Sequence, residues 1–256
     1  HGTRPDARET GILEEILLEN KKRNPNHSFS IFDTVLWEKA FFQKNLDLYL
    51  NTHMTDVLAD GNMIKKVIAE QLTTEKKYEI EATIFVDATG DGTLAYLAGA
   101  EYMSGREGRD VFGEKYAPEK SDHYTMGSSL LFSAVDLGHP VPFEKPEWAN
   151  TYTEEDLIHR DHAEITSGYW WIEIGGDKLD VVADGEEVRN ELIKALFGVW
   201  DHIKNGGCHN ADNYTLDWVG FLPGKRESRR IAGDYMLKEQ DLLGSRIFYD
   251  AVAYGG

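Results

Sequence analysis

The sequence predicts a mixed α/β protein, α+β in character, built around a β-meander that ends in a strand–turn–helix unit. Three observations lead to this expectation. Segments with helical period alternate with segments with strand period along the 256 residues. A continuous apolar run at residues 82–86 leads directly into a glycine-rich turn. A long amphipathic segment at residues 186–204 supplies a helix that can cover a core.

Two helices are expected at the start of the chain. Residues 9–23 place isoleucine and leucine at helical spacing, with glutamates on the other face and three basic residues at the carboxyl end. An Asn-Pro-Asn sequence at residues 24–26 ends this helix. A second helix is expected to begin at Asp33, which is a suitable N-cap, and to stop at Asn45.

A three-stranded meander is expected next. Residues 46–50 alternate between leucine and polar residues, and this strand continues through Val57 to a hairpin turn at residues 60–62. The return strand spans residues 63–70. A third strand runs over residues 78–88, and its continuous apolar run predicts a strand that is covered on both faces.

The second half of the chain is expected to hold strands around one long helix. Residues 104–150 are irregular apart from an apolar stretch at 128–135. Strands are expected over 166–183, and the helix over 186–204 follows them. A strand at 216–222 then leads into a basic segment.

The charge balance and the cysteine content exclude several classes of protein. With 27 Lys and Arg against 45 Asp and Glu, the formal net charge is −18, which argues against a nucleic-acid partner because phosphate binding needs a basic surface. The single cysteine, Cys208, excludes an internal disulfide framework and any cysteine-rich metal site. No apolar run reaches the roughly 20 residues that cross a bilayer, so we expect no membrane partner.

The turn after the third strand is the sharpest local signal for ligand binding. Glycines at positions 90 and 92 let the backbone turn tightly and approach a ligand without a Cβ clash. The helix that begins at Thr93 directs free N–H groups toward an anion such as phosphate. Residues 90–95 also fit the G-x-G-x-x-A spelling of dinucleotide-binding turns. The alternative is a tight turn that is glycine-rich for structural reasons alone.

A basic cluster near the end of the chain, formed by Arg226, Arg229 and Arg230, is unusual in so acidic a sequence. The planar guanidinium groups suit carboxylates, phosphates or the pyrimidine edge of a flavin. The alternative is an internal network of ion pairs with the many acidic residues, and the local sequence leaves both open.

The histidines and the cysteine give no clear signal for a metal or a nucleophile. His159 and His162 are three residues apart, which can place two imidazoles on one helical face. No third ligand is marked, so we expect no metal site. Cys208 beside His209 does not supply the geometry of a nucleophilic pair, and no G-x-S-x-G serine motif occurs.

Three motifs that follow one another along the chain resemble those of a known family. The sequence VDATGDG at residues 86–92, followed closely by AGA, resembles the second flavin-contacting motif of FAD-dependent oxidoreductases with a glutathione-reductase-like nucleotide domain. The segments GTR at 2–4 with RETGILEE at 8–15, and LPGKRESRRI at 222–231 followed by GDY, resemble two further hallmarks of a bacterial branch of that family. Relatives in this branch sometimes carry a xanthan-lyase label.

The resemblance implies part of a Rossmann-like domain for FAD or NAD(P), with the β-meander as an insertion, and a mixed substrate domain. It implies FAD as the cofactor and hydride transfer between a small-molecule substrate and the flavin. Thr3 and Arg4 would fall near the isoalloxazine ring, and Val57 would contact adenine through its backbone. The arginine cluster would hold an anionic group of the substrate or the negative charge of the reduced flavin. The residues expected along the FAD are Ala88, Thr89, Gly90, Asp91 and Gly92.

On this interpretation the chain has three parts. Residues 1–103 form a partial FAD-binding domain with the meander, residues 104–215 form a substrate or insert domain, and residues 216–256 return toward the FAD domain. The family's opening G-x-G-x-x-G unit does not occur in the sequence, and the chain has no initial methionine. We therefore expect an internal piece of a longer protein, which binds FAD weakly or not at all and is inactive by itself.

Two other interpretations stay open. A carbohydrate-active protein, either a polysaccharide lyase or a sugar-binding module, would use the aromatic and acidic residues Trp170, Trp171, Glu173 and Asp177. A non-catalytic piece would expose apolar surface and self-associate into a homo-oligomer. The compartment is also open between cytoplasm and export, because any export signal would precede residue 1.

Overall fold

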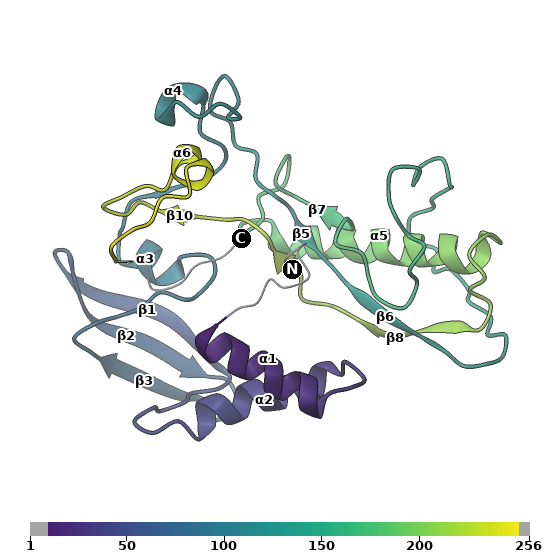
Figure 1. Ribbon diagram of the computed structural model, residues 1–256, viewed down its shortest axis with the longest axis horizontal. Coiled ribbons are helices and arrows are strands. Elements are labelled where there is room, and N and C mark those ends of the chain that lie inside the picture. Colours follow the sequence, from purple (N-terminus) through teal and green to yellow (C-terminus); the bar gives the residue numbers. More distant parts are fainter. Residues whose placement is uncertain (1–9, 251–256) are drawn as a thin grey trace. The chain divides into compact units, whose positions relative to one another are not determined.

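The computed structural model describes residues 10–250 of the chain, which divides into two compact units (Figure 1). Among the described residues, unit 1 consists of residues 10–85 together with residues 247–250, and unit 2 spans Val86–Arg246. The domain boundaries expected after residues 103 and 215 do not coincide with this division. The assignment of a cofactor part and a substrate part stays a prediction.

Unit 1 opens with a pair of helices, α1 (Gly11–Arg23) and α2 (Phe29–Phe41), of which the first confirms the prediction. Between them lies the buried side chain of Asn24. Its Nδ2 donates to the Ser28 carbonyl oxygen at 2.7 Å, and its Oδ1 accepts the Ser28 N–H at 2.7 Å. Because this turn closes at Ser28, the second helix begins four residues before Asp33, and the prediction of Asp33 as its N-cap is wrong.

The expected meander is confirmed as an antiparallel sheet in which β2 (Met63–Gln71) lies between β1 (Thr52–Asp60) and β3 (Lys76–Glu81). The β1–β2 turn falls at Gly61, whose φ of +57° is the left-handed conformation that short hairpin turns favour. Residues 46–50 are not a strand despite their alternation, because no strand among the described residues pairs with them.

The apolar run at residues 82–86 does not form the covered strand that the sequence predicts. The strand β3 ends at Glu81, and Ile84 and Val86 are 78% and 82% exposed. A strand buried on both faces needs neighbouring strands for its backbone N–H and C=O groups and a layer against each face. Within residues 10–250 no strand pairs with this run, so the prediction of a strand to residue 88 is wrong.

The core of unit 2 forms around α5 (Gly185–Asn205), which confirms the predicted long helix. Its apolar face packs against β6 (Phe132–Asp136), which pairs with β8 (Tyr214–Val219), and the three elements lie side by side in Figure 1. The rings of Phe132 and Trp200 meet edge to face with centroids 5.6 Å apart. The buried apolar side chains of α5 are Val188, Leu192, Ala195, Leu196, Val199, Trp200 and Ile203.

Short strands join segments of unit 2 that are far apart in sequence. The strand β5 (Ser128–Ser129) lies between β7 (Glu173–Ile174) and β9 (Gly224–Lys225), and β10 (Arg230–Ile231) pairs with β4 (Tyr102–Met103). Of the strands expected over 166–183, only β7 forms. The remaining short helices are α3 (Thr93–Leu97), α4 (Arg109–Phe112) and α6 (Glu239–Leu243).

Every strand pair among the described residues is antiparallel, so this stretch of chain is α+β, as the sequence predicts. The Rossmann-like part of the expectation stays a prediction. None of the helices formed by residues 10–250 combines the length and the apolar character that crossing a bilayer requires.

The replacement Leu192→Ala should destabilise unit 2, because this side chain is fully buried on the core face of α5. We expect the free energy of unfolding to fall by about 2–5 kcal/mol, the usual result of deleting a buried leucine side chain. Urea unfolding followed by tryptophan fluorescence measures this, since five of the six tryptophans lie in unit 2. The control Leu222→Ala, at a side chain that is 90% exposed, should change the value by less than about 0.5 kcal/mol. Equal effects of the two replacements would contradict this description of the core.

Candidate functional site

The turn at residues 86–92 is organised by Asp87. Its Oδ1 accepts hydrogen bonds from the backbone N–H and the hydroxyl of Thr89 at 3.0 and 2.7 Å, and its Oδ2 accepts the Ala95 N–H at 2.9 Å. The Thr89 hydroxyl oxygen accepts the Thr93 N–H at 2.8 Å. Burial alone would raise the pKa of Asp87, but these hydrogen bonds outweigh it and lower the pKa. The charged carboxylate therefore ties the turn to the first residues of α3.

Two glycines give the turn its shape. Gly90 and Gly92 have left-handed backbones, with φ of +83° and +61°. A Cβ on Gly92 would come within 2.8 Å of the Ile231 Cδ1 atom, so a larger residue here would have to displace the Ile231 side chain of β10. A Cβ on Gly90 would meet no atom within 4 Å. The turn thus presents bare backbone to open space at Gly90, which is how a glycine admits a ligand close to the chain.

The segment at residues 225–229 reaches this turn because the strands at both of its ends are paired. At one end β9 pairs with β5, and at the other β10 pairs with β4, which follows α3 closely in the chain. The pairing brings side chains together across 134 to 138 positions of sequence. The two motifs at residues 86–92 and 222–231 therefore meet in unit 2.

Asp91 is the point at which the two motifs join. Its carboxylate forms an ion pair with Lys225 and accepts the Ser228 hydroxyl at 2.8 Å, and its carbonyl oxygen accepts a hydrogen bond from Arg229 at 3.1 Å. Burial alone would raise the pKa of Asp91, but Lys225 and Ser228 outweigh it and lower the pKa. A pocket of about 260 Å³ lies at this junction, and its lining residues are Thr89, Gly90, Asp91, Lys225, Arg226, Glu227 and Ser228.

Two of the three predicted arginines are held by carboxylates. Arg226 pairs with Glu173 at 2.6 Å. Arg230 pairs with Glu107 and, at 2.6 Å, with Glu227. The network of ion pairs that the sequence left open as an alternative is therefore present, and it fixes the direction of each guanidinium group.

The third arginine, Arg229, is held by a ring and a carbonyl group. Its guanidinium carbon lies 4.0 Å from the centroid of the Tyr96 ring on α3, a cation–π distance, and it donates to the Asp91 carbonyl oxygen. Arg229 therefore ties the second motif to the helix that follows the first.

The other predicted site residues lie elsewhere. Val57 is on β1 of unit 1, where it pairs with Val67 and is 9% exposed. Val57 belongs to unit 1 and the turn at residues 88–92 belongs to unit 2. The expected adenine contact of Val57 therefore stays a prediction. Thr3 and Arg4 lie outside the described residues.

Several of the residues that the carbohydrate hypothesis assigns to sugar binding already contact other residues of the chain. The rings of Tyr169 and Trp171 stack with centroids 5.1 Å apart, and the Trp171 indole donates to the Asp161 carbonyl oxygen at 2.7 Å. Glu173 pairs with Arg226. Trp170 is 59% exposed, and a single exposed indole does not make a stacking platform.

Comparison with known families decides the assignment. The sequence profile of a family described as FAD dependent oxidoreductase matches residues 3–256 of the chain. The chain belongs to this family, and its cofactor is FAD. The carbohydrate hypothesis gains no support from this match. No curated protein and no solved structure shows a significant match to the chain.

The pocket fits a portion of the FAD. Gly90 leaves the space that a Cβ would fill, and the Asp91 carboxylate is engaged by Lys225, so it does not confront a negatively charged ligand as a free charge. Cofactor sites in proteins typically measure about 300–1,000 Å³. At about 260 Å³ this pocket would hold one part of the dinucleotide, with the remainder lying beyond it.

Sequence reasoning missed residues that matter in the structure. Lys225 and Ser228 stand inside the quoted motif, but no local pattern says that they bind Asp91. A second group, Glu154, His202, Cys208 and His209, comes together in unit 2 without any ligand spacing in the sequence. The hydrogen bond from Cys208 holds the pKa of Glu154 at about 2, below the usual value for glutamate. His159, expected to share a helical face with His162, is exposed in a non-helical segment.

The replacement Asp91→Asn should cost unit 2 about 1 kcal/mol of stability at pH 7, because it removes the charged partner of Lys225 in a partly exposed site. Since the pKa of Asp91 is lowered in the folded chain, its contribution is present above the unfolded pKa and is lost as the pH falls through the folded value. The difference in unfolding free energy between wild type and variant should therefore shrink below about pH 4.

Urea unfolding between neutral pH and pH 3 measures this difference. The control Asp217→Asn replaces an exposed aspartate on β8 of the same unit and should leave the stability at pH 7 within about 0.5 kcal/mol of wild type. A difference for Asp91→Asn that stays constant across the pH range would show that the carboxylate charge does not join the two motifs.

Proposed function

We propose that this chain supports hydride transfer between a small-molecule substrate and FAD, and that the turn at residues 88–92 contacts the cofactor. One observation carries the proposal: two segments that resemble motifs of the family, joined across 134 positions of sequence, line a single pocket. FAD, when bound, supplies the ring that takes up or releases the hydride. The chain's own residues bind the cofactor, orient it and set the charge around it.

The turn would hold the dinucleotide mainly through its backbone. Ala88 and Thr89 are exposed, and Gly90 has open space on the side where other residues carry a Cβ. Asp91 and Gly92 face the second motif instead, through the ion pair with Lys225 and the close approach of β10. On this assignment, Thr89 and Gly90 touch the ligand within the pocket, Ala88 touches the part of it that extends beyond the pocket, and Asp91 and Gly92 keep the turn in shape.

Among the arginines, Arg226 is best placed to meet an anionic group of the substrate or the flavin. It lines the pocket, and 38% of its side chain is exposed. The pair with Glu173 leaves other N–H donors of its guanidinium fork available for a carboxylate or phosphate oxygen. Arg229 and Arg230 are not among the lining residues, so we assign them to positioning the motif through Tyr96 and Glu107.

Three further contacts rest on the family resemblance alone. We propose Thr3 and Arg4 beside the isoalloxazine ring and Val57 beside the adenine. The substrate itself is a small molecule whose class neither motif defines.

Titration of the chain with FAD tests the proposal. The titration extends to about 1 mM, where a binding free energy of about −4 kcal/mol already gives half saturation. Quenching of the flavin fluorescence measures occupancy. We expect saturable binding, and we expect Gly90→Ala to raise Kd about tenfold, equal to about 1.4 kcal/mol, because it places a methyl group in the open space of the pocket.

A matched control separates ligand contact from backbone strain. Gly138 has φ of +72° and nothing within 4 Å of an added Cβ, so Gly138→Ala imposes a similar strain on a loop that does not line the pocket. Its Kd for FAD should stay at the wild-type value. Equal weakening in both variants, or no weakening in Gly90→Ala, would remove the turn from the cofactor site. A chain that shows no saturable FAD binding would overturn the proposal.

A further inference from the structure

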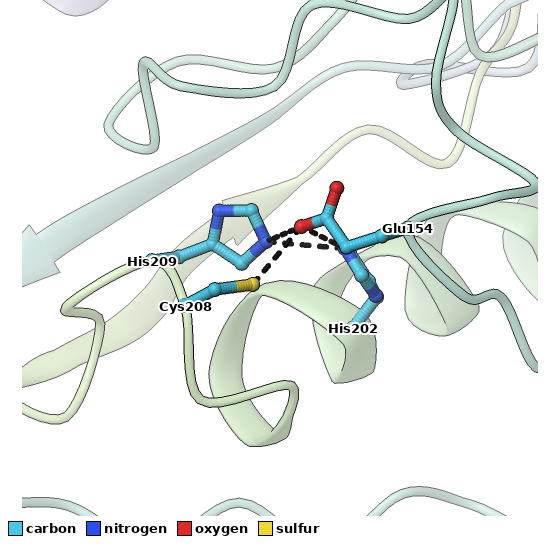
Figure 2. Close-up of side chains that lie close together, drawn as sticks. All are labelled: Glu154, His202, Cys208 and His209. Carbon is cyan, nitrogen blue, oxygen red and sulfur yellow. Dashed lines mark hydrogen bonds and ion pairs between the residues drawn. The ribbon is translucent and has the colours of Figure 1, made fainter.

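Four side chains of different chemical types converge in unit 2 at a place separate from the pocket described above. They are Glu154, His202, Cys208 and His209, and each offers one donor atom (Figure 2). These four atoms, one oxygen, two nitrogens and one sulfur, all lie within 4.8 Å of one another. None of the four residues lines the pocket at Asp91.

The fold fixes the positions of three of the four residues, His202 on α5 and Cys208 and His209 in the loop after it. His202 lies in the last turn of α5 and is buried, and Cys208 and His209 follow in the loop after the helix. The buried Lys204 donates from Nζ to the carbonyl oxygens of Ala211 and Asp212 at 2.8 and 2.7 Å. These bonds fold the loop back onto α5, so that its cysteine and histidine face His202.

The donor atoms are packed closely around one carboxylate oxygen. Glu154 Oε1 lies 2.9 Å from the Cys208 Sγ, 3.0 Å from the His209 Nε2 and 3.2 Å from the His202 Nε2. The two histidine Nε2 atoms are 3.1 Å apart. Only one proton fits between these two Nε2 atoms, so at least one of them directs a lone pair at its neighbours, where a cation can take it up.

The spacing matches the coordination shell of a small tetrahedral ion. Zinc bonds to nitrogen or oxygen measure about 2.0–2.1 Å and bonds to sulfur about 2.3 Å, which places neighbouring ligand atoms of a tetrahedron about 3.3–3.6 Å apart. The observed separations of 2.9–3.2 Å around Glu154 Oε1 need to open by about 0.2–0.7 Å, and the widest separation in the group, at most 4.8 Å, needs to close by about 1 Å. No backbone movement of the size of a loop rearrangement is required.

A third histidine completes the surroundings. His162 Nδ1 lies 2.5 Å from the Arg160 carbonyl oxygen, an acceptor, so in the neutral ring this nitrogen is the one that carries the proton and Nε2 is the one that offers a lone pair. That Nε2 lies 3.6 Å from Glu154 Oε1, and the ring lies 4.8 Å from the His209 ring between centroids. A backbone carbonyl that fixes the tautomer in this way is the usual second partner of a metal-binding histidine.

We propose that Glu154, His202, Cys208 and His209 bind one zinc ion. A thiolate with two imidazoles and a carboxylate favours Zn²⁺ over Ca²⁺ or Mg²⁺, which take oxygen ligands. Binding replaces the Cys208 thiol proton, which passes to solvent, and uses the neutral form of both imidazoles. Four protein ligands close the shell, so the ion ties the segment around Glu154 and the loop after α5 to the end of that helix. The proposal does not depend on how the chain handles FAD.

Metal analysis of the chain purified without chelator is the first test, and we expect one equivalent of zinc by mass spectrometry. The stripped chain is then titrated with Co²⁺, whose ligand-field bands report tetrahedral geometry and whose sulfur-to-cobalt band reports thiolate coordination. Cys208→Ala should abolish the sulfur band. His209→Ala should weaken binding by more than about 100-fold, since even loss of an outer partner costs about 10–100-fold.

His159→Ala is the matched control. This histidine is exposed in the segment that also carries Glu154 and His162, and it lies outside the donor cluster. The variant should keep both the stoichiometry and the cobalt spectrum of the wild type. Zinc below a tenth of an equivalent, together with no tetrahedral cobalt spectrum in the folded wild type, would overturn the proposal. Equal loss in His159→Ala would assign the binding to surface histidines and would also overturn it.

Discussion

The candidate flavin site depends on one carboxylate that joins two distant stretches of chain. Asp91 sits in a turn of the first motif and binds Lys225 and Ser228 of the second. Its side chain is 19% exposed, so the ion pair is screened less by water and salt than a surface pair would be. Strand pairing at β9 and β10 brings the second motif near the turn, but the carboxylate fixes which residues face each other. The Asp91 carboxylate is therefore the contact that keeps Gly90 and Arg226 on the same pocket.

The electrostatics of this site are local. In a chain of net charge −18, Lys225, Arg226 and Arg230 each meet a carboxylate. An anionic ligand therefore gains little from a long-range positive field, which such pairing cancels and salt screens. The attraction that remains for such a ligand comes from directional contacts. These are hydrogen bonds from guanidinium groups that the ion pairs hold in place, and contacts with the exposed backbone at Gly90. Recognition at such a site depends on the shape and hydrogen-bonding edge of the ligand more than on its total charge.

The parts of the fold that local chemistry determines were predictable from the sequence. The helix over residues 9–23 and the long helix before Asn205 follow from apolar periodicity, and the hairpin turn at Gly61 follows from a residue that tolerates positive φ. Residues 46–50 and 82–86 carry strand-like patterns but find no pairing partner among the described residues. Whether a segment forms a strand depends on a neighbouring strand to pair with, and the sequence of the segment itself does not show whether that neighbour exists.

The same limit applies to the sites. The glycines of the first motif predict a tight turn because backbone conformation depends on the residue itself. The contact between Lys225 and Asp91 spans 134 positions, so no local pattern predicts it. For the four-donor cluster, Cys208 and His209 are adjacent in the sequence, but their spacing to the other two residues predicts no metal site. Glu154 lies 48 positions before His202, and nothing in the spacing predicts that the loop after α5 folds back to meet both.

The two centres lie toward opposite ends of one helix, which bears on how they affect each other. Near the start of α5, Val188 packs beside Gly175, just after the strand whose Glu173 holds Arg226. His202 comes fourteen residues later, about 21 Å along the helix axis. Between them, the buried face of α5 is close-packed, and such interiors have low compressibility and transmit strain. An ion at His202 therefore acts directly on the loop and segment that it joins, and α5 is the packed element through which a shift at its last turn would reach the strand that carries Glu173.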